Sequence, residues 1–332
     1  MKAGNTRFSL LGSMINFKTA SSITLALIFS SQMVVAETML MQLREQITSP
    51  AYEGWWPNDD GTYKLFFGYM NTNWEQQFDI SVGADNYFSN VGAGELDDLA
   101  KDGFDFSDAD QGQPTHFYPR RNPFLFTIDV PADFGDEEMV WTLKTQGQVN
   151  RAYGTLKPDY RIDPQVISTE VGGNFGSLSD SLRTNISPEL RVEGESFRSV
   201  RVGQPLSLAV RASDPDNLPA RRAAPRTSNG QIYRPPSSIV AMSGPGLRFS
   251  WTIYRGPAES ASFNPAQFKT YTDTRMYANS PWSPPFEIPM PPEDGRWTAE
   301  VTFDEPGEYV LRGIASDGSM FTYQNINVTV TR

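Results

Sequence analysis

Residues 247–254 read LRFSWTIY and carry the strongest fold signal in the second half of the chain. Apolar and polar side chains alternate along this stretch, which places Phe249, Trp251 and Ile253 on one face of a β-strand. Such a strand packs its apolar face against a second layer, because an isolated sheet would leave that face in water. We therefore expect a β-sandwich here, with Trp251 as its core anchor.

Four further phrases flank this strand, three of them with turn residues and the last a closing strand. They are 212–216 (ASDPD), 306–309 (PGEY), 315–318 (ASDG) and 328–330 (VTV). Pro306 and Gly307 predict a turn, after which Tyr309 is expected to bury its ring while its hydroxyl caps nearby backbone. This arrangement is the tyrosine corner of immunoglobulin-like sandwiches.

Together with the Ser-Trp pair at 250–251, these phrases resemble the PKD and bacterial cadherin-like modules of extracellular proteins. The resemblance covers residues 188–332 and implies a sandwich used for spacing or adhesion rather than a catalytic fold. Two features depart from it. An insert occupies 217–246, where a tight turn is expected, and the stretch 271–297 is rich in proline and aromatic residues.

The first half of the chain also predicts β-strands, separated by turn residues. The clearest are 62–70, 124–130 and 139–145. Short alternating strands with little helical periodicity indicate an antiparallel sandwich within 37–160, interrupted by an acidic loop at 83–112. Its motifs resemble no family that we can name. Residues 37–60 are expected to be a lead-in, with a helical turn that ends at Pro50.

Residues 161–187 are expected to form a linker, because proline and glycine are frequent there and strand signals are few. The sequence thus predicts an all-β protein, with two antiparallel β-sandwich (Ig-like) domains after an N-terminal signal peptide.

The first 36 residues have the layout of a secretory signal peptide. Basic residues precede a short apolar run, and Ala36 supplies the small side chain at the expected cut. A membrane anchor is the alternative, although the run is short for a spanning helix of about 20 residues. No later segment is apolar enough to span a bilayer. We therefore expect a secreted or periplasmic protein whose mature chain begins at Glu37.

The composition excludes several functional classes. The chain has 332 residues, a formal net charge of −11 and no cysteine. Acidic proteins repel phosphate backbones, so nucleic acid is not an expected partner. Without cysteine the chain forms no disulfide and no Cys-ligated metal site.

Catalytic signals are sparse. His116 is the only histidine, no Gly-x-Ser-x-Gly motif accompanies it, and a catalytic triad or a site with several His or Cys ligands is therefore not expected. We expect an exported non-catalytic protein of the bacterial envelope that acts in binding, adhesion or structure. The alternative is a carboxylate-dependent, glycosidase-like hydrolase, since suitable acid pairs are plentiful in this sequence.

Aromatic and amide side chains of the first domain are the first candidates for ligand contact. They are Trp55, Trp56 and Trp74, with Asn71 and Asn73 beside them. Such groups stack on sugar rings or grip peptides, so the predicted partner is a glycan or an envelope protein. The alternative is that these rings fill the core. If 55–56 is extended, the two adjacent tryptophans point to opposite faces.

Two charged segments supply the remaining candidates. Arg221 and Arg222 lie in the basic insert and are candidates for ligand binding, because their charge opposes that of the acidic loop. The alternatives are that the two loops dock on each other or on a sister molecule, or that the insert is a solvated loop with no partner. Asp108, Asp110, Asp214 and Asp216 have the alternate spacing that aims two carboxylates at one calcium ion. The alternative for the second pair is a turn that uses the side chains to bind backbone. No other cofactor is expected.

Overall fold

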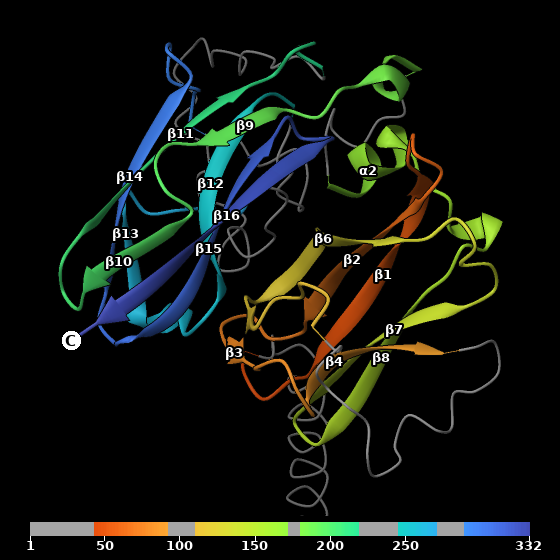
Figure 1. Ribbon diagram of the computed structural model, residues 1–332, viewed down its shortest axis with the longest axis horizontal. Helices are drawn as coiled ribbons and strands as arrows, with labels where there is room; N and C mark the ends of the chain where they lie inside the picture. The colour runs from red at the N-terminus through yellow and green to blue at the C-terminus, as the bar shows by residue number, and fades with distance from the viewer. Residues whose placement is uncertain (1–42, 92–109, 172–179, 219–244, 271–288) are drawn as a thin grey trace, which may run out of the picture. The chain divides into compact units, whose positions relative to one another are not determined.

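The computed structural model describes residues 43–91, 110–171, 180–218, 245–270 and 289–332, which belong to one compact unit (Figure 1). Strands dominate these residues, which confirms the all-β prediction. No helix in the described ranges is long and apolar enough to cross a bilayer. The predicted leader 1–36, together with Asp108, Arg221 and Arg222, lies outside the described residues.

The first sandwich pairs two three-stranded antiparallel sheets, with orders β1-β2-β6 and β4-β7-β8. Its strands are β1 (Thr48–Pro57), β2 (Tyr63–Asn71), β3 (Phe78–Asp79), β4 (Asn86–Val91), β5 (His116–Phe117), β6 (Arg120–Val130), β7 (Glu138–Thr145) and β8 (Gln148–Gly154). Strands β3 and β5 form a separate pair. Aromatic rings fill the core: Phe67 stacks on Phe126, and Phe88 stacks on the fully buried Trp141.

Strand β1 lies where the sequence predicted a lead-in, so that prediction is wrong for residues 48–57. Pro50 is tolerated because β1 is a terminal strand of its sheet. Gly54 sits at a bulge with a φ of 130°. A Cβ atom at this position would lie 2.6 Å from the carbonyl oxygen of Tyr160, so glycine is what allows the following segment to pack closely on β1.

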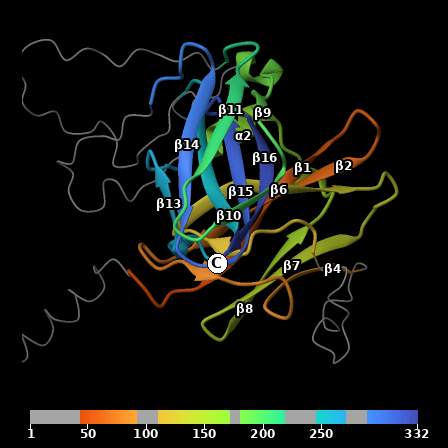
Figure 2. The same ribbon diagram turned by 60° about the vertical axis from the view of Figure 1, so that its left-hand side comes forward.

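The second sandwich has the strand order of an immunoglobulin-like domain (Figure 2). Its strands are β9 (Glu189–Val192), β10 (Phe197–Arg201), β11 (Leu206–Ser213), β12 (Arg248–Arg255), β13 (Ala261–Asn264), β14 (Arg296–Phe303), β15 (Gly307–Ser316) and β16 (Phe321–Thr331). One sheet has the order β9-β11-β14-β13 and the other β10-β16-β15-β12. These orders match strands A-B-E-D and C-F-G of that fold, with β10 added parallel to β16.

Two predicted details of this sandwich are confirmed. Trp251 on β12 is 2% exposed and belongs to the core between the sheets. The Tyr309 hydroxyl donates to the Glu305 carbonyl at 3.0 Å, which is the geometry of a tyrosine corner.

The segment expected to be a linker is partly helical. It contains α2 (Pro164–Val171) and the 3-10 helix η5 (Asp180–Thr184), and the 3-10 helix η3 (Pro158–Tyr160) precedes it. Ile162 and Ile167 are buried in a cluster with Phe66 of β2 and Met320 of the second sandwich. These side chains cover the face of β2 opposite to the first core, so both faces of that strand are buried.

The two sandwiches also share side chains directly. Tyr254 comes from β12, yet its buried ring belongs to the core of the first sandwich, and its hydroxyl donates to the Gly112 carbonyl at 2.5 Å. Arg312 of β15 is 3% exposed and donates to the Leu125 carbonyl of β6 at 2.6 Å. Its guanidinium lies 3.4 Å from the centre of the Tyr254 ring. These contacts hold the edge of β12 against the first sandwich.

Candidate functional site

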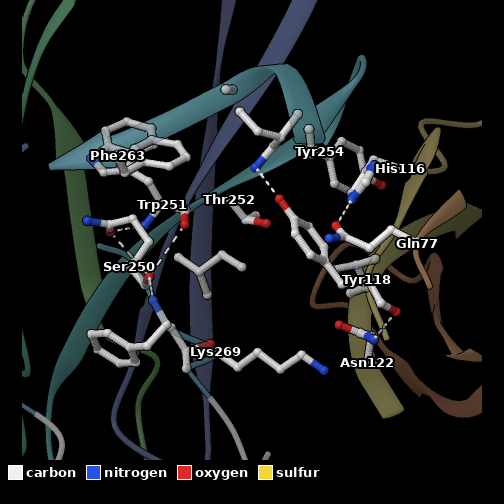
Figure 3. Close-up of a pocket in the computed structure, with 18 of the residues that line it drawn as sticks. Gln77, His116, Tyr118, Asn122, Ser250, Trp251, Thr252, Tyr254, Phe263 and Lys269 are labelled. Atoms are coloured by element: carbon white, nitrogen blue, oxygen red, sulfur yellow. Dashed lines mark hydrogen bonds between the residues drawn. The ribbon is translucent and has the colours of Figure 1, made fainter. Parts of the chain in front are cut away.

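A cleft lies between the two sandwiches, beside the terminal strands β12 and β13 of the second sandwich (Figure 3). It has a volume of about 570 Å³, which falls in the range of roughly 300–1,000 Å³ typical of small-molecule sites. Strands β12 and β13 each end a sheet and line one wall. The first sandwich lines the other wall through Tyr118, Asn122 and Leu125. Residues 266–270, which follow β13, complete the cleft.

The free edge of β12 faces side chains rather than another strand. The Trp251 amide donates to Gln267 Oε1 at 2.8 Å, and the Ile253 amide donates to the Tyr118 hydroxyl at 3.1 Å. Desolvation raises the pKa of Tyr118, so its hydroxyl stays neutral in this contact. These two edge amides are therefore satisfied by side chains instead of by a neighbouring strand.

His116 lines the cleft, but its ring nitrogens are committed within the protein. Nδ1 lies 2.7 Å from Asp79 Oδ1, and Nε2 lies 2.7 Å from Gln77 Oε1. The ring is buried and packs edge-on against Tyr118 at 4.4 Å. A general base needs a free nitrogen within reach of a substrate proton, and His116 does not present one in this arrangement.

Among the described residues that line the cleft, Trp251 and Thr270 each carry a buried polar atom with no hydrogen-bond partner. These atoms are Trp251 Nε1 and Thr270 Oγ1, and each residue is 2% exposed. The indole nitrogen is a donor only, whereas the hydroxyl both donates and accepts. An unsatisfied buried group of this kind costs about 1–3 kcal/mol.

Lys269 crosses from the second sandwich toward the first. Its Nζ donates to the carbonyl oxygens of Pro119 at 2.7 Å and Arg121 at 3.3 Å. Figure 3 shows the side chain extended in the direction of Asn122, on the side of the cleft away from Phe263. The Lys269 ammonium thus lies on the side of the cleft that holds Asn122 and Tyr118, whereas Phe263 and Trp251 lie on the other side.

The predicted tryptophan pair lies on β1 outside this cleft. Trp55 and Trp56 are both half-buried and pack on opposite sides of the strand. Trp55 donates from Nε1 to the Lys157 carbonyl at 2.9 Å and packs with the first core. Trp56 contacts the Phe66 ring at 4.5 Å and lines a shallow hollow of about 400 Å³ beside Arg161.

The other predicted residues of this group serve the fold. Asn71 and Asn73 are fully buried, and they hydrogen-bond each other and nearby backbone. Trp74 is half-buried and lies beneath the Arg120 guanidinium, 4.6 Å from its ring centre. The structure therefore does not bring these three residues together with Trp55 and Trp56 as one binding surface.

The predicted calcium ligands that the structure describes bind protein groups. Asp110 accepts two hydrogen bonds from Arg255, at 2.6 and 2.9 Å, and this contact lowers its pKa. Asp214 accepts from the Asn217 amide and Asp216 from the Leu218 amide, as the turn alternative predicts. Asp216 also accepts from the distant Ile186 amide. In the described part of the chain, no group of three or more acidic or histidine side chains is arranged to hold a metal ion.

A buried acid lies close to this turn. Asp317 is fully buried and accepts from the amides of Ser319 and Met320 and from Asn185 Nδ2. Burial raises the pKa of Asp317 to about 7. Burial and the neighbouring Asp216 raise the pKa of Asp214 to about 6. The contact with Asn185 ties the connecting segment to the second sandwich.

The cleft residues were not foreseen as a site. Trp251 was recognised, but only as a core anchor, and Lys269 and Thr270 lie in a stretch without strand or motif signal. Their proximity to Gln77 and Tyr118 depends on the packing of two domains.

Comparison with known proteins leaves the family open. Neither a protein-family model nor a curated protein matches the chain. Among solved structures, a chimeric titin Z1Z2 carrying a decorin peptide is 11% identical, covers 87% of this chain and 100% of its own, and has a TM-score of 0.21.

Two bacterial structures give similar values. Fibronectin(III)-like modules of Clostridium thermocellum CbhA are 9% identical over 81% of this chain and 85% of theirs, with a TM-score of 0.20. Domains 4 and 5 of the S-layer protein SbsC are 11% identical over 88% and 96%, with a TM-score of 0.22. With TM-scores this low, the immunoglobulin-like assignment of the second sandwich rests on its strand order.

Proposed function

We propose that this protein is an exported, non-catalytic binding protein whose ligand occupies the cleft between its two sandwiches. The observation that carries the proposal is the pair of unpartnered buried groups that two described lining residues of the cleft carry, Trp251 Nε1 and Thr270 Oγ1. A ligand that enters the cleft and hydrogen-bonds these groups recovers part of the cost of leaving them unpaired. The aromatic side chains around them supply apolar contact area.

Binding has more support in this cleft than the hydrolase alternative. Glycoside hydrolysis needs two carboxyl groups about 5–10 Å apart, one of them able to donate a proton. The described residues that line the cleft include no aspartate or glutamate. His116, the one histidine of the chain, is hydrogen-bonded through both ring nitrogens.

Location in the bacterial envelope and an adhesive role belong to the same proposal. They are supported by the signal-like layout of residues 1–36 and by the resemblance of 188–332 to PKD and cadherin-like modules. The expected partner is a glycan or an envelope protein. A predicted calcium ion near Asp214 and Asp216 would have to compete with the backbone amides that these carboxylates bind.

The binding test compares the full mature chain with three variants. Envelope-polysaccharide fragments, short peptides and small organic acids are screened by thermal shift, since a ligand at 100 times its Kd stabilises by about 2.7 kcal/mol. Trp251→Phe and Thr270→Val remove the unpaired groups, and each should weaken binding by about tenfold. Trp297→Phe is the matched control, because Trp297 packs at the edge of the same core outside the cleft.

Two results would contradict the proposal. One is a ligand that binds Trp251→Phe and Thr270→Val as tightly as it binds the control variant. The other is steady turnover of any compound in the screen, because a binding protein releases its ligand unchanged.

A second contact site is proposed at Trp56. This residue lines a hollow with Pro57, Arg161 and Asp163, and an aromatic ring beside charged groups suits a sugar ring. Trp56→Ala should abolish glycan binding at this edge without affecting ligands of the cleft. Equal glycan affinity in Trp56→Ala and wild type would exclude the site.

A further inference from the structure

The turn between β15 and β16 contacts both ends of the segment that connects the two sandwiches. Ser319 Oγ donates to the Pro164 carbonyl at 3.0 Å, where α2 begins. Asn185, which directly follows η5, donates from Nδ2 to Asp317 Oδ2 at 3.1 Å. Met320 is buried in the cluster that covers the outer face of β2. This turn therefore attaches the connecting segment to the second sandwich.

A second turn, directly after β11, contacts the same segment through carboxyl groups. Asp216 Oδ2 accepts from the Ile186 amide at 2.9 Å. Asp214 lies within hydrogen-bonding reach of Asp216, and its charge also acts on Asp317. Three acidic side chains, from two turns of the second sandwich, thus gather around residues 185–186. We call Asp214, Asp216 and Asp317 the acid cluster.

The charged groups on the neighbouring elements contact other partners. In η5, Arg183 pairs with Asp163 at 3.2 Å and with Asp180 at 3.6 Å. On β12, the Arg248 guanidinium donates to the Gly246 carbonyl at 3.0 Å. Within the described ranges, no lysine or arginine forms an ion pair with the acid cluster. Its negative charge is therefore not offset by a basic side chain of this part of the chain.

Burial makes negative charge on the acid cluster unfavourable. Asp317 is fully buried, and the side-chain atoms Asp214 Oδ2 and Asn185 Oδ1 are buried without a hydrogen-bond partner. A proton removes the charge that burial penalises. Burial accordingly raises the pKa of Asp317 to about 7, although its three N–H contacts act in the opposite direction. The folded arrangement therefore binds protons more tightly than an opened one, in which the carboxyl groups reach water.

From this arrangement we propose that protons on the acid cluster hold the connecting segment against the second sandwich, and that the segment opens locally as pH rises. Thermodynamic linkage gives the direction, because the state that binds protons more tightly is favoured at low pH. The opening is local, since Tyr254 and Arg312 join the sandwiches elsewhere. This device is independent of any ligand in the cleft.

Amide hydrogen exchange of the full mature chain tests the proposal. The Ile186 amide reports directly, because its hydrogen bond to Asp216 breaks when the segment opens. Exchange is measured from pH 5 to pH 8 and corrected for the intrinsic, base-catalysed rate. One linked proton changes an opening equilibrium by at most about tenfold per pH unit. Opening of residues 180–187 should therefore increase by at least about tenfold across this range, while opening of β7 stays unchanged.

Neutral variants identify the groups that bind the protons. Asp317→Asn and Asp214→Asn imitate the protonated side chains, and each should reduce the pH dependence of opening at 180–187. Asp214 is only partly buried, so Asp214→Asn gives a result even where Asp317→Asn does not fold. Asp133→Asn is the matched control, because Asp133 is exposed on the first sandwich, and it should keep the wild-type pH dependence.

Three results would overturn the proposal. The first is equal corrected opening of 180–187 at pH 5 and pH 8; a decrease on adding calcium in that case would assign the acid cluster to a metal ion. The second is a pH dependence that survives unchanged in the folded Asn variants. The third is an equal increase at β7, because the opening would then be global unfolding and not release of the connecting segment.

Discussion

Tyr254 offers the sharpest test of how the two sandwiches are joined. Its strand, β12, belongs to the second sandwich, but its ring is 2% exposed within the core of the first. Truncating a buried aromatic side chain to alanine costs about 3–5 kcal/mol. The whole unfolding free energy of a domain is only about 5–15 kcal/mol, so Tyr254→Ala should be severely destabilised.

A graded pair of substitutions separates the ring from the hydroxyl. Tyr254→Phe keeps the ring and removes the hydroxyl that donates to the Gly112 carbonyl, so it should cost about 1 kcal/mol. Phe197→Ala is the control, because Phe197 is 78% exposed and its loss should change stability by less than about 0.5 kcal/mol. Denaturant unfolding monitored by circular dichroism gives all three values.

Amide hydrogen exchange then shows which strands are destabilised by Tyr254→Ala. If Tyr254 joins the cores, Tyr254→Ala lowers the protection of β7 in the first sandwich and of β15 in the second together. Loss confined to β12 and β15 would refute the shared core. So would a Tyr254→Ala variant as stable as Phe197→Ala.

Three further predictions concern the second sandwich. Tyr309→Phe removes the hydroxyl bond to the Glu305 carbonyl and should cost about 1 kcal/mol in thermal or denaturant unfolding, and no loss would contradict the tyrosine corner. Asp317 has its pKa raised to about 7 by burial, so its contribution to stability is complete below about pH 4 and lost as pH rises toward 7. Unfolding free energies measured across that range should fall in wild type by at most about 1.4 kcal/mol per pH unit for this group, and Asp317→Asn should flatten the slope. The fragment 188–332 holds all strands of the second sandwich and should fold alone with a β-type circular dichroism spectrum, but melt below the full chain because Tyr254 becomes exposed.

The sequence predicted the second sandwich well because its strands and turns are marked by residues that lie close together in the chain. Alternation placed Trp251 in the core, and a Pro-Gly turn followed by tyrosine gave the corner at Tyr309. Strand β1 was not predicted because it contains Pro50, and a proline is normally excluded from the middle of a sheet. Pro50 is tolerated here because β1 is a terminal strand.

The cleft and the connecting segment depend on contacts between residues far apart in sequence. Lys269 meets the Pro119 carbonyl 150 positions away, and no short window contains both. Likewise, the sequence predicts a linker at Ile162 and Ile167, although both side chains pack against Phe66 on β2. This contact joins residues about a hundred positions apart, so it appears only in the folded chain. For Asn71 and Asn73 the local pattern was misleading, because side-chain amides beside tryptophans suggested a ligand site. Both side chains are buried and donate to backbone carbonyls instead.

The most direct measurement of the central claim is the indole region of a ¹⁵N–¹H spectrum during ligand titration. The chain has seven tryptophans and hence at most seven indole signals, and Trp251→Phe assigns the relevant one. For any compound that stabilises the protein in the thermal screen, cleft binding predicts that the Trp251 Nε1–H signal shifts in proportion to occupancy while that of Trp297 does not. A Trp251 signal that stays unchanged with every stabilising compound would contradict cleft binding, even where the Trp56 signal shifts as expected for the second contact site.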